Sequence, residues 1–391
     1  MIINFARFCG LSSKNKIYHG INKLYLVERF IKQTRPFATQ NTSKQQHLNH
    51  RYVLIERPVN RSVQLTDFSL TTSPISELNS NEVLLKTLWL SLDPYMRGRM
   101  SAGKSYVQPV GIGEVMVGQG VAEVVKSNDP NIVPGQIVLA DVGWQEYACL
   151  SSKDIISIDN TNTSFPSSYY LGCLGMPGMT AYFALQEIGR PEKGETVLVS
   201  AASGAVGQIV GQIAKLKGCT VIGIAGGNEK CTYITKTLGF DSAIDYKNKS
   251  VKQLTNEIRH LAPNGINIYF DNVSGIIHDS AMLNLAIQGR VIICGVISTF
   301  DQLESVDNGP RWMRILLIKR ALMQGFLVTD YEHRRNEFLN EMKSWLENGQ
   351  LKYREDIAEG LQATPQAFIG MLQGKNHGKQ LVRIAEQTVR S

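Results

Sequence analysis

The stretch VLVSAASGAVGQIVGQIAKLKG, from Val197 to Gly218, constrains the fold more than any other part of the chain. It opens as a β-branched run, turns through small residues and continues with apolar residues at helical spacing. In a strand–turn–helix with the pattern G-x-G-x-x-G, the glycines make the turn, admit a pyrophosphate and let helix and strand pack closely. Gly204 and Gly207 fill the second and third glycine places, and Ala202 replaces the first. The stretch therefore predicts a dinucleotide site with phosphates at the helix N-terminus.

Strand-like and helix-like segments alternate around this stretch. The compact apolar runs ETVLVSA, CTVIGIAG, NIYFDNV and GRVIICGV are typical of buried strands, whereas VGQIVGQIAKLKG, KCTYITKTLG and HDSAMLNLAIQ predict helices. This alternation predicts a parallel, doubly wound α/β sheet. From Tyr52, short runs bounded by Gly, Pro and Asn predict an antiparallel, barrel-like domain. HRRNEFLNEMKSWLENGQ predicts an amphipathic helix, and PQAFIGMLQGKNHGKQLVRIA a helix, a turn and a final strand.

The end of the next strand indicates which dinucleotide is bound. An NAD site usually has an acidic residue about 20 residues after the glycines, which binds the ribose 2′-hydroxyl. This chain instead has Ala225, Gly226 and Gly227, followed by Lys230. No carboxylate there would repel a 2′-phosphate, and the ammonium of Lys230 could attract one. Although Lys230 could also be a solvated helix residue, the pattern favours NADP(H).

The net charge of +7 is confined to the first fifty residues, which hold eight basic residues and one acidic residue. The remainder is neutral, which argues against a nucleic-acid partner. Residues 1–46 mix Arg and Lys with apolar residues, as mitochondrial presequences do, and RPFATQ resembles a processing site near Phe37. A disordered basic tail is the alternative. No stretch reaches the ~20 apolar residues of a membrane span, and the six cysteines contain no Cys-x-x-Cys pair.

Several motifs resemble those of one family. They are WLSLDPYMRGRM, LGMPGMTAY, AASGAVGQIVGQIAKLKGC, GFDSAIDYK, FDNVSG, CGVIS and FIGMLQGKNHGK. From about Arg51 to Ile384 the chain resembles zinc-free medium-chain dehydrogenase/reductases of the prostaglandin reductase, alkenal double-bond reductase and bacterial curcumin reductase group. SLDPYMRGRMS and FIGMLQGKN place it nearest the curcumin reductase branch. The resemblance implies a GroES-like catalytic domain over 47–172 and 343–391, a Rossmann domain over 173–342, and a homodimer.

The superfamily also includes zinc alcohol dehydrogenases, whose metal ligands can be compared with this sequence. The Gly-His-Glu stretch of those enzymes corresponds here to VGQGVAEVV, which has no histidine, and the four-cysteine lobe is missing. The seven histidines form no ligand-spaced set with cysteine or carboxylate. The sequence therefore predicts no metal, and alcohol oxidation through a metal alkoxide is disfavoured.

The resemblance implies that hydride passes from NADPH to the β-carbon of an α,β-unsaturated ketone or aldehyde. Quinone reduction on the same scaffold and a cofactor-binding protein with little turnover are the alternatives. The implied cofactor-binding residues are Ser203, Gly204, Ala205, Val206, Gly207, Lys230, Tyr246, Asn272, Cys294, Gly295, Val296, Ile297, Ser298, Phe300, Phe326, Leu327, Val328 and Asn376. Lys230 and Tyr246 would bind the 2′-phosphate. Asn272 and Asn376 could instead form turns.

Two positions bear on the chemistry itself. The resemblance makes Tyr95 the polar group beside the substrate carbonyl, although it could equally be a core or rim aromatic. Family members usually carry a tyrosine where this chain has Phe300, whose ring donates no hydrogen bond. Water, Tyr95 or a cofactor hydroxyl would then supply the proton, and we expect slower turnover than in the family.

Overall fold

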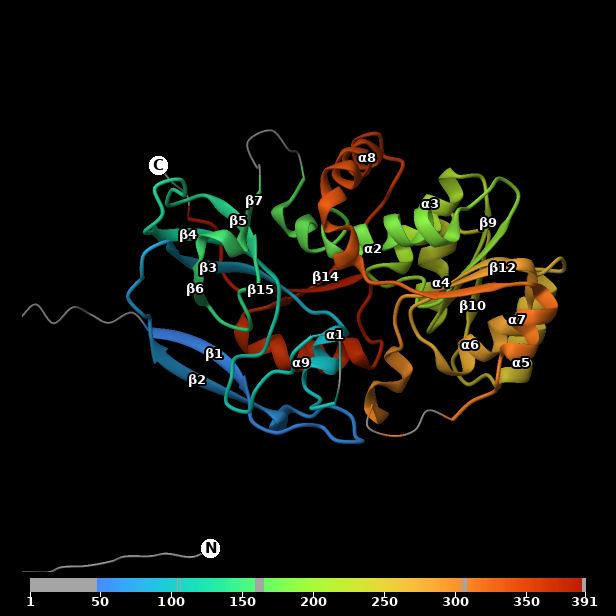
Figure 1. Ribbon diagram of the computed structural model, residues 1–391, viewed down its shortest axis with the longest axis horizontal. Coiled ribbons are helices and arrows are strands. Elements are labelled where there is room, and N and C mark those ends of the chain that lie inside the picture. The colour runs from blue at the N-terminus through green and yellow to red at the C-terminus, as the bar shows by residue number, and fades with distance from the viewer. Residues whose placement is uncertain are drawn as a thin grey trace, which may run out of the picture. The chain divides into compact units, whose positions relative to one another are not determined.

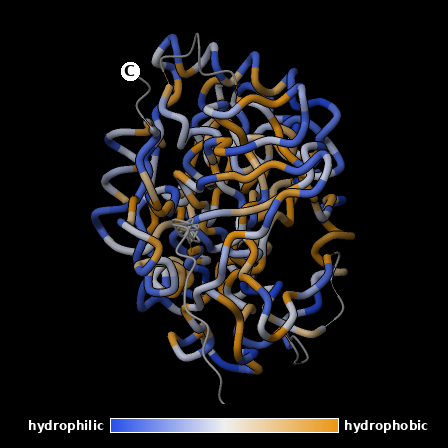
Figure 2. The backbone as a smooth tube through the Cα atoms, turned by 90° about the vertical axis from the view of Figure 1, so that its left-hand side faces the viewer, coloured by the Kyte–Doolittle hydropathy of each residue, from blue (hydrophilic) through white to orange (hydrophobic). Residues whose placement is uncertain are grey.

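The computed structural model describes residues 48–388 apart from 104, 106, 159–164, 304, 306 and 307. The predicted leader over residues 1–46 lies outside the described residues, so its cleavage and a mitochondrial location stay predictions. Strand pairing arranges the described part around two large sheets and one two-stranded ribbon. Figure 1 shows these elements, and Figure 2 shows hydrophobic stretches gathered inside with hydrophilic ones around the rim.

The six-stranded sheet carries the opening sequence feature. All its neighbouring strands are parallel, in the order β10-β9-β8-β11-β12-β13. This order is that of a doubly wound dinucleotide-binding sheet. The chain builds the sheet outward from β8 to β10 on one side and from β11 to β13 on the other, so the strand order reverses between β8 and β11. The predicted α/β architecture is confirmed. Its strands are β8 (Thr196–Val199), β9 (Thr220–Ala225), β10 (Ser242–Asp245), β11 (Ile266–Asp271), β12 (Leu285–Ile293) and β13 (Leu322–Gly325).

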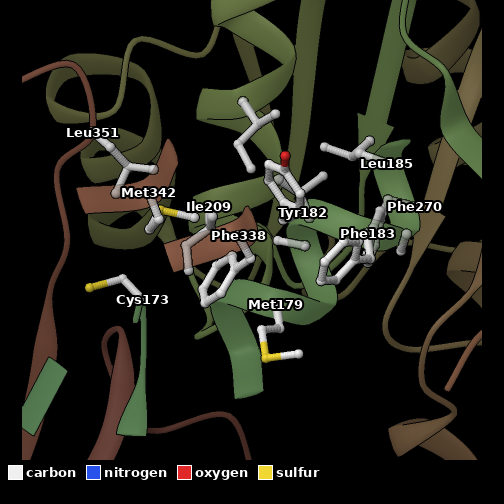
Figure 3. Packing of buried hydrophobic residues seen from close by; sticks show 14 of the residues in the cluster. Cys173, Met179, Tyr182, Phe183, Leu185, Ile209, Phe270, Phe338, Met342 and Leu351 are labelled. Atoms are coloured by element: carbon white, nitrogen blue, oxygen red, sulfur yellow. The ribbon is translucent and has the colours of Figure 1, made fainter. Parts of the chain in front are cut away.

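Helices cover both faces of this sheet because successive strand residues point to opposite sides. Val197 and Val199 belong to a core cluster with α2 (Met176–Ala184), α3 (Gly207–Leu216) and α8 (Arg335–Glu347). Figure 3 shows Tyr182 and Phe183 of α2 beside Phe338 of α8 in this cluster. On the other face, Leu198 packs with residues of α5 (Val251–Leu261) and α6 (Gly275–Met282). The remaining helices of the cofactor half are α4 (Asn228–Thr232) and α7 (Met313–Lys319).

The seven-stranded sheet unites the two ends of the described chain. Its order is β14-β15-β3-β4-β5-β7, and β6 also pairs with β3. All these pairs are antiparallel except β14 with β15. The strands are β3 (Glu82–Ser91), β4 (Gly120–Ser127), β5 (Ile137–Ala140), β6 (Tyr147–Ser151), β7 (Ile155–Ser157), β14 (Glu355–Glu359) and β15 (Lys379–Arg383). The ribbon of β1 (Leu48–Leu54) and β2 (Phe68–Pro74), with α1 (Tyr95–Arg99) and α9 (Thr364–Leu372), completes this half.

One predicted helix is partly wrong. The segment HDSAMLNLAIQ, residues 278–288, is helical only to Met282, and β12 begins at Leu285. The side-chain amide of Asn284 donates to the carbonyls of Thr255 and Ser280, at 3.0 and 2.8 Å, and this ends the helix. The carbonyl of Asn284 then accepts from the backbone N–H of Ile266 at 2.8 Å, which starts strand pairing. These tertiary contacts override the helical spacing.

A buried ion pair fixes the C-terminal strand to the segment between β3 and α1. The Nζ of Lys379 donates to the carbonyl of Leu92 and to Oδ1 of Asp93, both at 2.7 Å. The other carboxylate oxygen of Asp93 accepts from the hydroxyl of Ser91. Lys379 is 1% exposed, and burial lowers its pKa below the usual lysine range despite the neighbouring Asp93. The pair therefore sets where α1 begins.

We expect Lys379→Met to lower the free energy of unfolding by about 3–5 kcal/mol, because it leaves the Asp93 carboxylate buried without its partner. Lys379→Met combined with Asp93→Asn should lose less than Lys379→Met alone, because no uncompensated charge remains. Urea unfolding measures all three. The matched control is Lys126→Met, which breaks an exposed 3.6 Å pair with Glu77 and should change stability by about 0.5 kcal/mol or less. A double variant at least as unstable as Lys379→Met alone would contradict this role of the pair.

Candidate functional site

A cleft of about 740 Å³ lies between the two halves. One wall is formed by residues that follow the carboxyl ends of β8, β9, β11, β12 and β13. The opposite wall is formed by α1 with its flanking segments and by residues from the end of α9 to the start of β15. The cleft thus lies at the point where the strand order of the parallel sheet reverses, which is where ligands bind in such sheets.

All the residues predicted from the sequence to form the site line this cleft. On the cofactor side they follow the six strands β8 to β13, whereas Asn376 lies between α9 and β15 and Tyr95 comes from α1. The structure therefore brings every predicted site residue together, while their individual roles stay predictions. They are Tyr95, Ser203, Gly204, Ala205, Val206, Gly207, Lys230, Tyr246, Asn272, Cys294, Gly295, Val296, Ile297, Ser298, Phe300, Phe326, Leu327, Val328 and Asn376.

The glycine-containing turn has the close contacts that a phosphate-binding turn needs. A Cβ at Gly207 would lie 2.3 Å from the carbonyl oxygen of Ala201, so only glycine allows α3 to begin there. Ala202 occupies the first glycine place, where it is fully buried, and a Cβ at Gly223 of β9 would lie 2.9 Å from its methyl group. Replacement of the first glycine by alanine therefore uses space that Gly223 leaves open. The turn leaves the N-terminus of α3 facing the cleft, as anion binding requires.

Positive charge gathers beyond the end of β9. The Nζ of Lys230 donates to the carbonyl of Gly374 at 2.7 Å, which holds the ammonium at the cleft. Burial lowers the pKa of Lys230, and the nearby charge of Lys247 lowers it further. A Cβ at Gly226 would lie 3.1 Å from Cε of Lys247, so this second lysine is close to the same turn. The sequence analysis did not single out Lys247, although it directly follows Tyr246 in the motif GFDSAIDYK.

A buried carboxylate organises the turn after β11. Oδ1 of Asp271 accepts from the backbone N–H groups of Val273 and Ser274, at 2.9 and 2.8 Å, and Oδ2 contacts Nδ1 of His278 at 2.9 Å. Asp271 is fully buried. The side chain of Asn272 donates to the carbonyl of Ser200 at 2.8 Å, so it joins the ends of β8 and β11 while it lines the cleft. Sequence reasoning found Asn272 but missed Asp271, whose role depends on contacts across the sheet.

The segment after β12 supplies the end of the cleft nearest the catalytic half. The backbone N–H of Cys294 donates to the carbonyl of Asp271 at 2.8 Å. Burial and the charge of Asp271 raise the pKa of the Cys294 thiol to about 12, so the thiol stays protonated at neutral pH. Phe300 follows in the 3₁₀ turn Ile297–Gln302. Oδ2 of Asp301 in this turn accepts from the hydroxyl of Ser62 at 2.5 Å, which ties the turn to the other half.

The catalytic half contributes α1 and the start of β15. Tyr95 and Arg99 are the first and last residues of α1, and both line the cleft. Lys379 and Asp93, which form an ion pair, also line the cleft. Asn376 donates its side-chain amide to the carbonyl of Gly378 at 2.8 Å, so it forms a turn and also borders the cleft. Sequence reasoning missed Lys379 because no motif marks an ion pair between residues so far apart in the chain.

Among the residues that the structure describes, no three or more His, Cys, Asp or Glu side chains gather as a metal site would require. Within this part of the chain no helix combines the length and apolarity needed to cross a bilayer.

The site residues fit a bound NADP(H). The turn at Gly207 leaves no room for a side chain, and the N-terminus of α3 faces the cleft. Lys230 lines the cleft after β9, with Lys247 near the same turn, and two ammonium groups there suit an extra phosphate. None of the described residues that follow β9 and line the cleft carries a carboxylate.

Comparison with known proteins also indicates an NADP(H)-dependent oxidoreductase. Residues 50–158 match the family model described as the N-terminal domain of oxidoreductase, and residues 205–345 match the model described as zinc-binding dehydrogenase. NADPH-dependent curcumin reductase of Escherichia coli is 43% identical over 88% of this chain and 99% of its own length. The NADP⁺-dependent 2-alkenal reductase of Nicotiana tabacum is 43% identical over 79% of this chain and 89% of its own.

A solved structure agrees with these relatives. The crystal structure of CurA from Vibrio vulnificus in complex with NADPH superimposes with a TM-score of 0.81 and 47% identity, covering 86% of this chain and 99% of that one. The predicted combination of a GroES-like domain with a Rossmann domain is confirmed, as is NADP(H) as the cofactor. The chain therefore belongs to the medium-chain dehydrogenase/reductases of the prostaglandin, alkenal and curcumin reductase group, and it is an NADP-dependent oxidoreductase.

Proposed function

We propose that this oxidoreductase uses NADPH to reduce the carbon–carbon double bond of α,β-unsaturated ketones and aldehydes, without zinc. The observation that carries the proposal is the cleft, where the predicted NADP-binding wall faces the wall that contains Tyr95. Similarity to a 2-alkenal reductase and to a curcumin reductase supports this class of substrate.

When bound, NADPH supplies the hydride, which the β-carbon of the substrate takes. Negative charge then develops on the carbonyl oxygen, and the hydroxyl of Tyr95 would donate a hydrogen bond to it. The glycine turn and the segment after β12 would hold the cofactor beside a substrate bound at α1, which would lower the entropic part of the barrier. The residues of the cleft thus bind and orient, and the cofactor carries the difficult chemistry.

The proton for the α-carbon needs another source, because the ring of Phe300 donates no hydrogen bond. Phe300 lines the cleft, at the position where the resemblance implies a tyrosine. Water, Tyr95 or a hydroxyl of the cofactor can supply this proton. Proton delivery without a hydroxyl at position 300 is the reason to expect slower turnover than in the family.

We also propose that two copies of the chain form a homodimer along β13. This strand is an edge of the parallel sheet, and its backbone is available for pairing. On the preceding helix α7, Met313 and Leu317 are 65% and 77% exposed, and such apolar patches often mark protein interfaces. Light scattering of the purified chain should report a particle of two chains. A single chain at micromolar concentration would overturn this proposal.

The direct test of the proposed activity is NADPH oxidation by the purified chain with a simple enone, with the product identified by mass. We expect a product two hydrogens heavier than the substrate with its carbonyl intact. A quinone in competition should be the poorer substrate, and preferential quinone reduction would favour the alternative oxidoreductase. Tight NADPH binding with no turnover of either compound would favour a cofactor-binding protein.

Lys230→Met should raise the KM for NADPH about 10- to 100-fold, because a charge-assisted bond to phosphate contributes about 1.5–3 kcal/mol. The KM for NADH should change much less, because NADH lacks the 2′-phosphate. Steady-state kinetics with both cofactors measure this. The control is Lys236→Met, an exposed lysine outside the cleft. An equal rise in both KM values would show that Lys230 acts on the fold instead.

The preference for NADPH over NADH, measured as the ratio of kcat/KM for the two cofactors, should also decrease as the pH is raised. Only the protonated ammonium of Lys230 attracts the phosphate, and burial lowers the pKa of this group. The loss should therefore begin at lower pH than for an ordinary lysine, and in Lys230→Met it should be absent. A preference that stays constant up to pH values where the protein unfolds would contradict the assignment.

Phe300→Tyr should raise kcat severalfold, because the new hydroxyl can assist protonation of the α-carbon. The gain should disappear as the phenol ionises, near its ordinary pKa of about 10. Single-turnover rates with a simple enone, measured across pH, separate this chemistry from product release. A variant no faster than the parent would count against a missing proton donor at this position.

A further inference from the structure

Two glutamines of α3 join the cofactor half of the protein to the other half. Gln208 and Gln212 lie one helical turn apart on α3 and are 0% and 4% exposed. Their amide groups bind residues 352–354, which lead into β14 of the seven-stranded sheet. Neither glutamine is among the described residues that line the cleft. Both side chains are therefore buried at a contact between the two halves that lies outside the site described above.

Each amide binds both backbone groups of one residue. Nε2 of Gln212 donates to the carbonyl of Lys352, and the N–H of Lys352 donates to Oε1 of Gln212, both at 2.8 Å. Gln208 repeats this pattern with Arg354: Nε2 donates to the carbonyl at 3.2 Å, and Oε1 accepts from the N–H at 3.1 Å. Neighbouring antiparallel strands exchange the same pair of bonds. The two side chains thus hold residues 352–354 in one register against α3.

The orientation of these amides is fixed by further partners. The hydroxyl of Tyr233 donates to Oε1 of Gln208 at 3.0 Å. Nε2 of Gln212 also donates to the backbone carbonyl of Gln208 at 2.8 Å. Because buried polar groups without partners are costly, any other placement of residues 352–354 would be penalised. This contact between the halves therefore has one favoured geometry.

The segment that the glutamines hold continues to the wall opposite the cofactor. The carbonyl of Arg354 also accepts from the backbone N–H of Lys379 at 3.0 Å. A Cβ at Gly378 would lie 2.3 Å from this carbonyl oxygen, so the two segments touch there. Lys379 in turn pairs with Asp93, just before α1. A continuous set of polar contacts therefore connects α3, which begins at the glycine turn, with the helix that carries Tyr95.

We propose that Gln208 and Gln212 are positioning residues, which set the distance between the cofactor and the substrate wall through residues 352–354. The N-terminus of α3 would hold the phosphates of the cofactor, and the buried face of the same helix holds the other half of the protein. Hydride transfer depends steeply on the placement of its donor and acceptor. The inference applies to any hydride acceptor bound beside Tyr95, so it goes beyond the proposed substrate class.

Gln212→Met tests this role, because methionine has a similar length but pairs with neither backbone group of Lys352. At saturating NADPH we expect the single-turnover rate to fall about 10- to 100-fold, while the Kd for NADPH changes by less than about threefold. The acceptor is whichever of a simple enone and a quinone the parent reduces. The rate is counted per NADPH-binding site, so that misfolded chains do not contribute.

Gln366→Met is the matched control, because Gln366 is exposed on α9 and is not among the described lining residues. This variant should keep the rate of the parent. Gln208→Met is the second test, in case Gln212→Met does not fold, and it should lower the rate in the same way. A parent-like rate in either α3 variant, or a rise in the Kd for NADPH as large as the fall in rate, would overturn the proposal.

Failure of the proposed function gives a different result. Reduction of a quinone but not of an enone, with the rate still lost in Gln212→Met, would refute the proposed substrate class and support the role of the glutamines. If neither acceptor is reduced, hydrogen exchange in the enzyme–NADPH complex still measures the coupling between the walls. In Gln212→Met the backbone N–H groups of α1 should exchange faster than in the parent. Faster exchange confined to α3 and residues 352–354 would show a local structural role and would overturn the proposal.

Discussion

The buried contact between Lys379 and Asp93 joins two ends of the chain at the place where the catalytic wall begins. Lys379 opens the last strand, and Asp93 stands between β3 and α1. A charge pair removed from water is costly unless both partners keep close contacts, so β15 has one stable position against β3. That position fixes the start of α1, and with it Tyr95 and Arg99. The geometry of the substrate end therefore depends on an ion pair that has no role in the proposed hydride and proton transfers and is not part of the cofactor motif.

The opposite wall follows from local constraints near the sheet. Parallel strands end at one edge, and the reversal of strand order between β8 and β11 leaves a crevice there. The missing Cβ of Gly207 lets α3 begin against Ala201, and Asp271 holds the next turn through backbone N–H groups. Lys230 lies at the end of the cleft expected for the 2′-phosphate, and Tyr95 lies on the wall expected for the substrate.

Local sequence patterns predicted most of the fold and the residues on the cofactor side of the cleft. Strand–turn–helix spacing predicted the parallel sheet, and the absence of an acidic residue after β9 indicated NADP(H). Interactions between distant segments could not be predicted, because nothing in the sequence pairs Lys379 with Asp93. The helix predicted over 278–288 was partly wrong for the same reason, since Asn284 is held by Thr255 from another helix. The site residues named through resemblance all line one cleft.

The central claim is that the two walls bring a hydride donor to the β-carbon of an enone. Its most direct measurement uses NADPH with deuterium at the transferable position and a simple enone, with the product examined by nuclear magnetic resonance. The account predicts one deuterium at the carbon β to an intact carbonyl. Deuterium on a carbinol carbon, with the double bond retained, would show carbonyl reduction and would contradict the account.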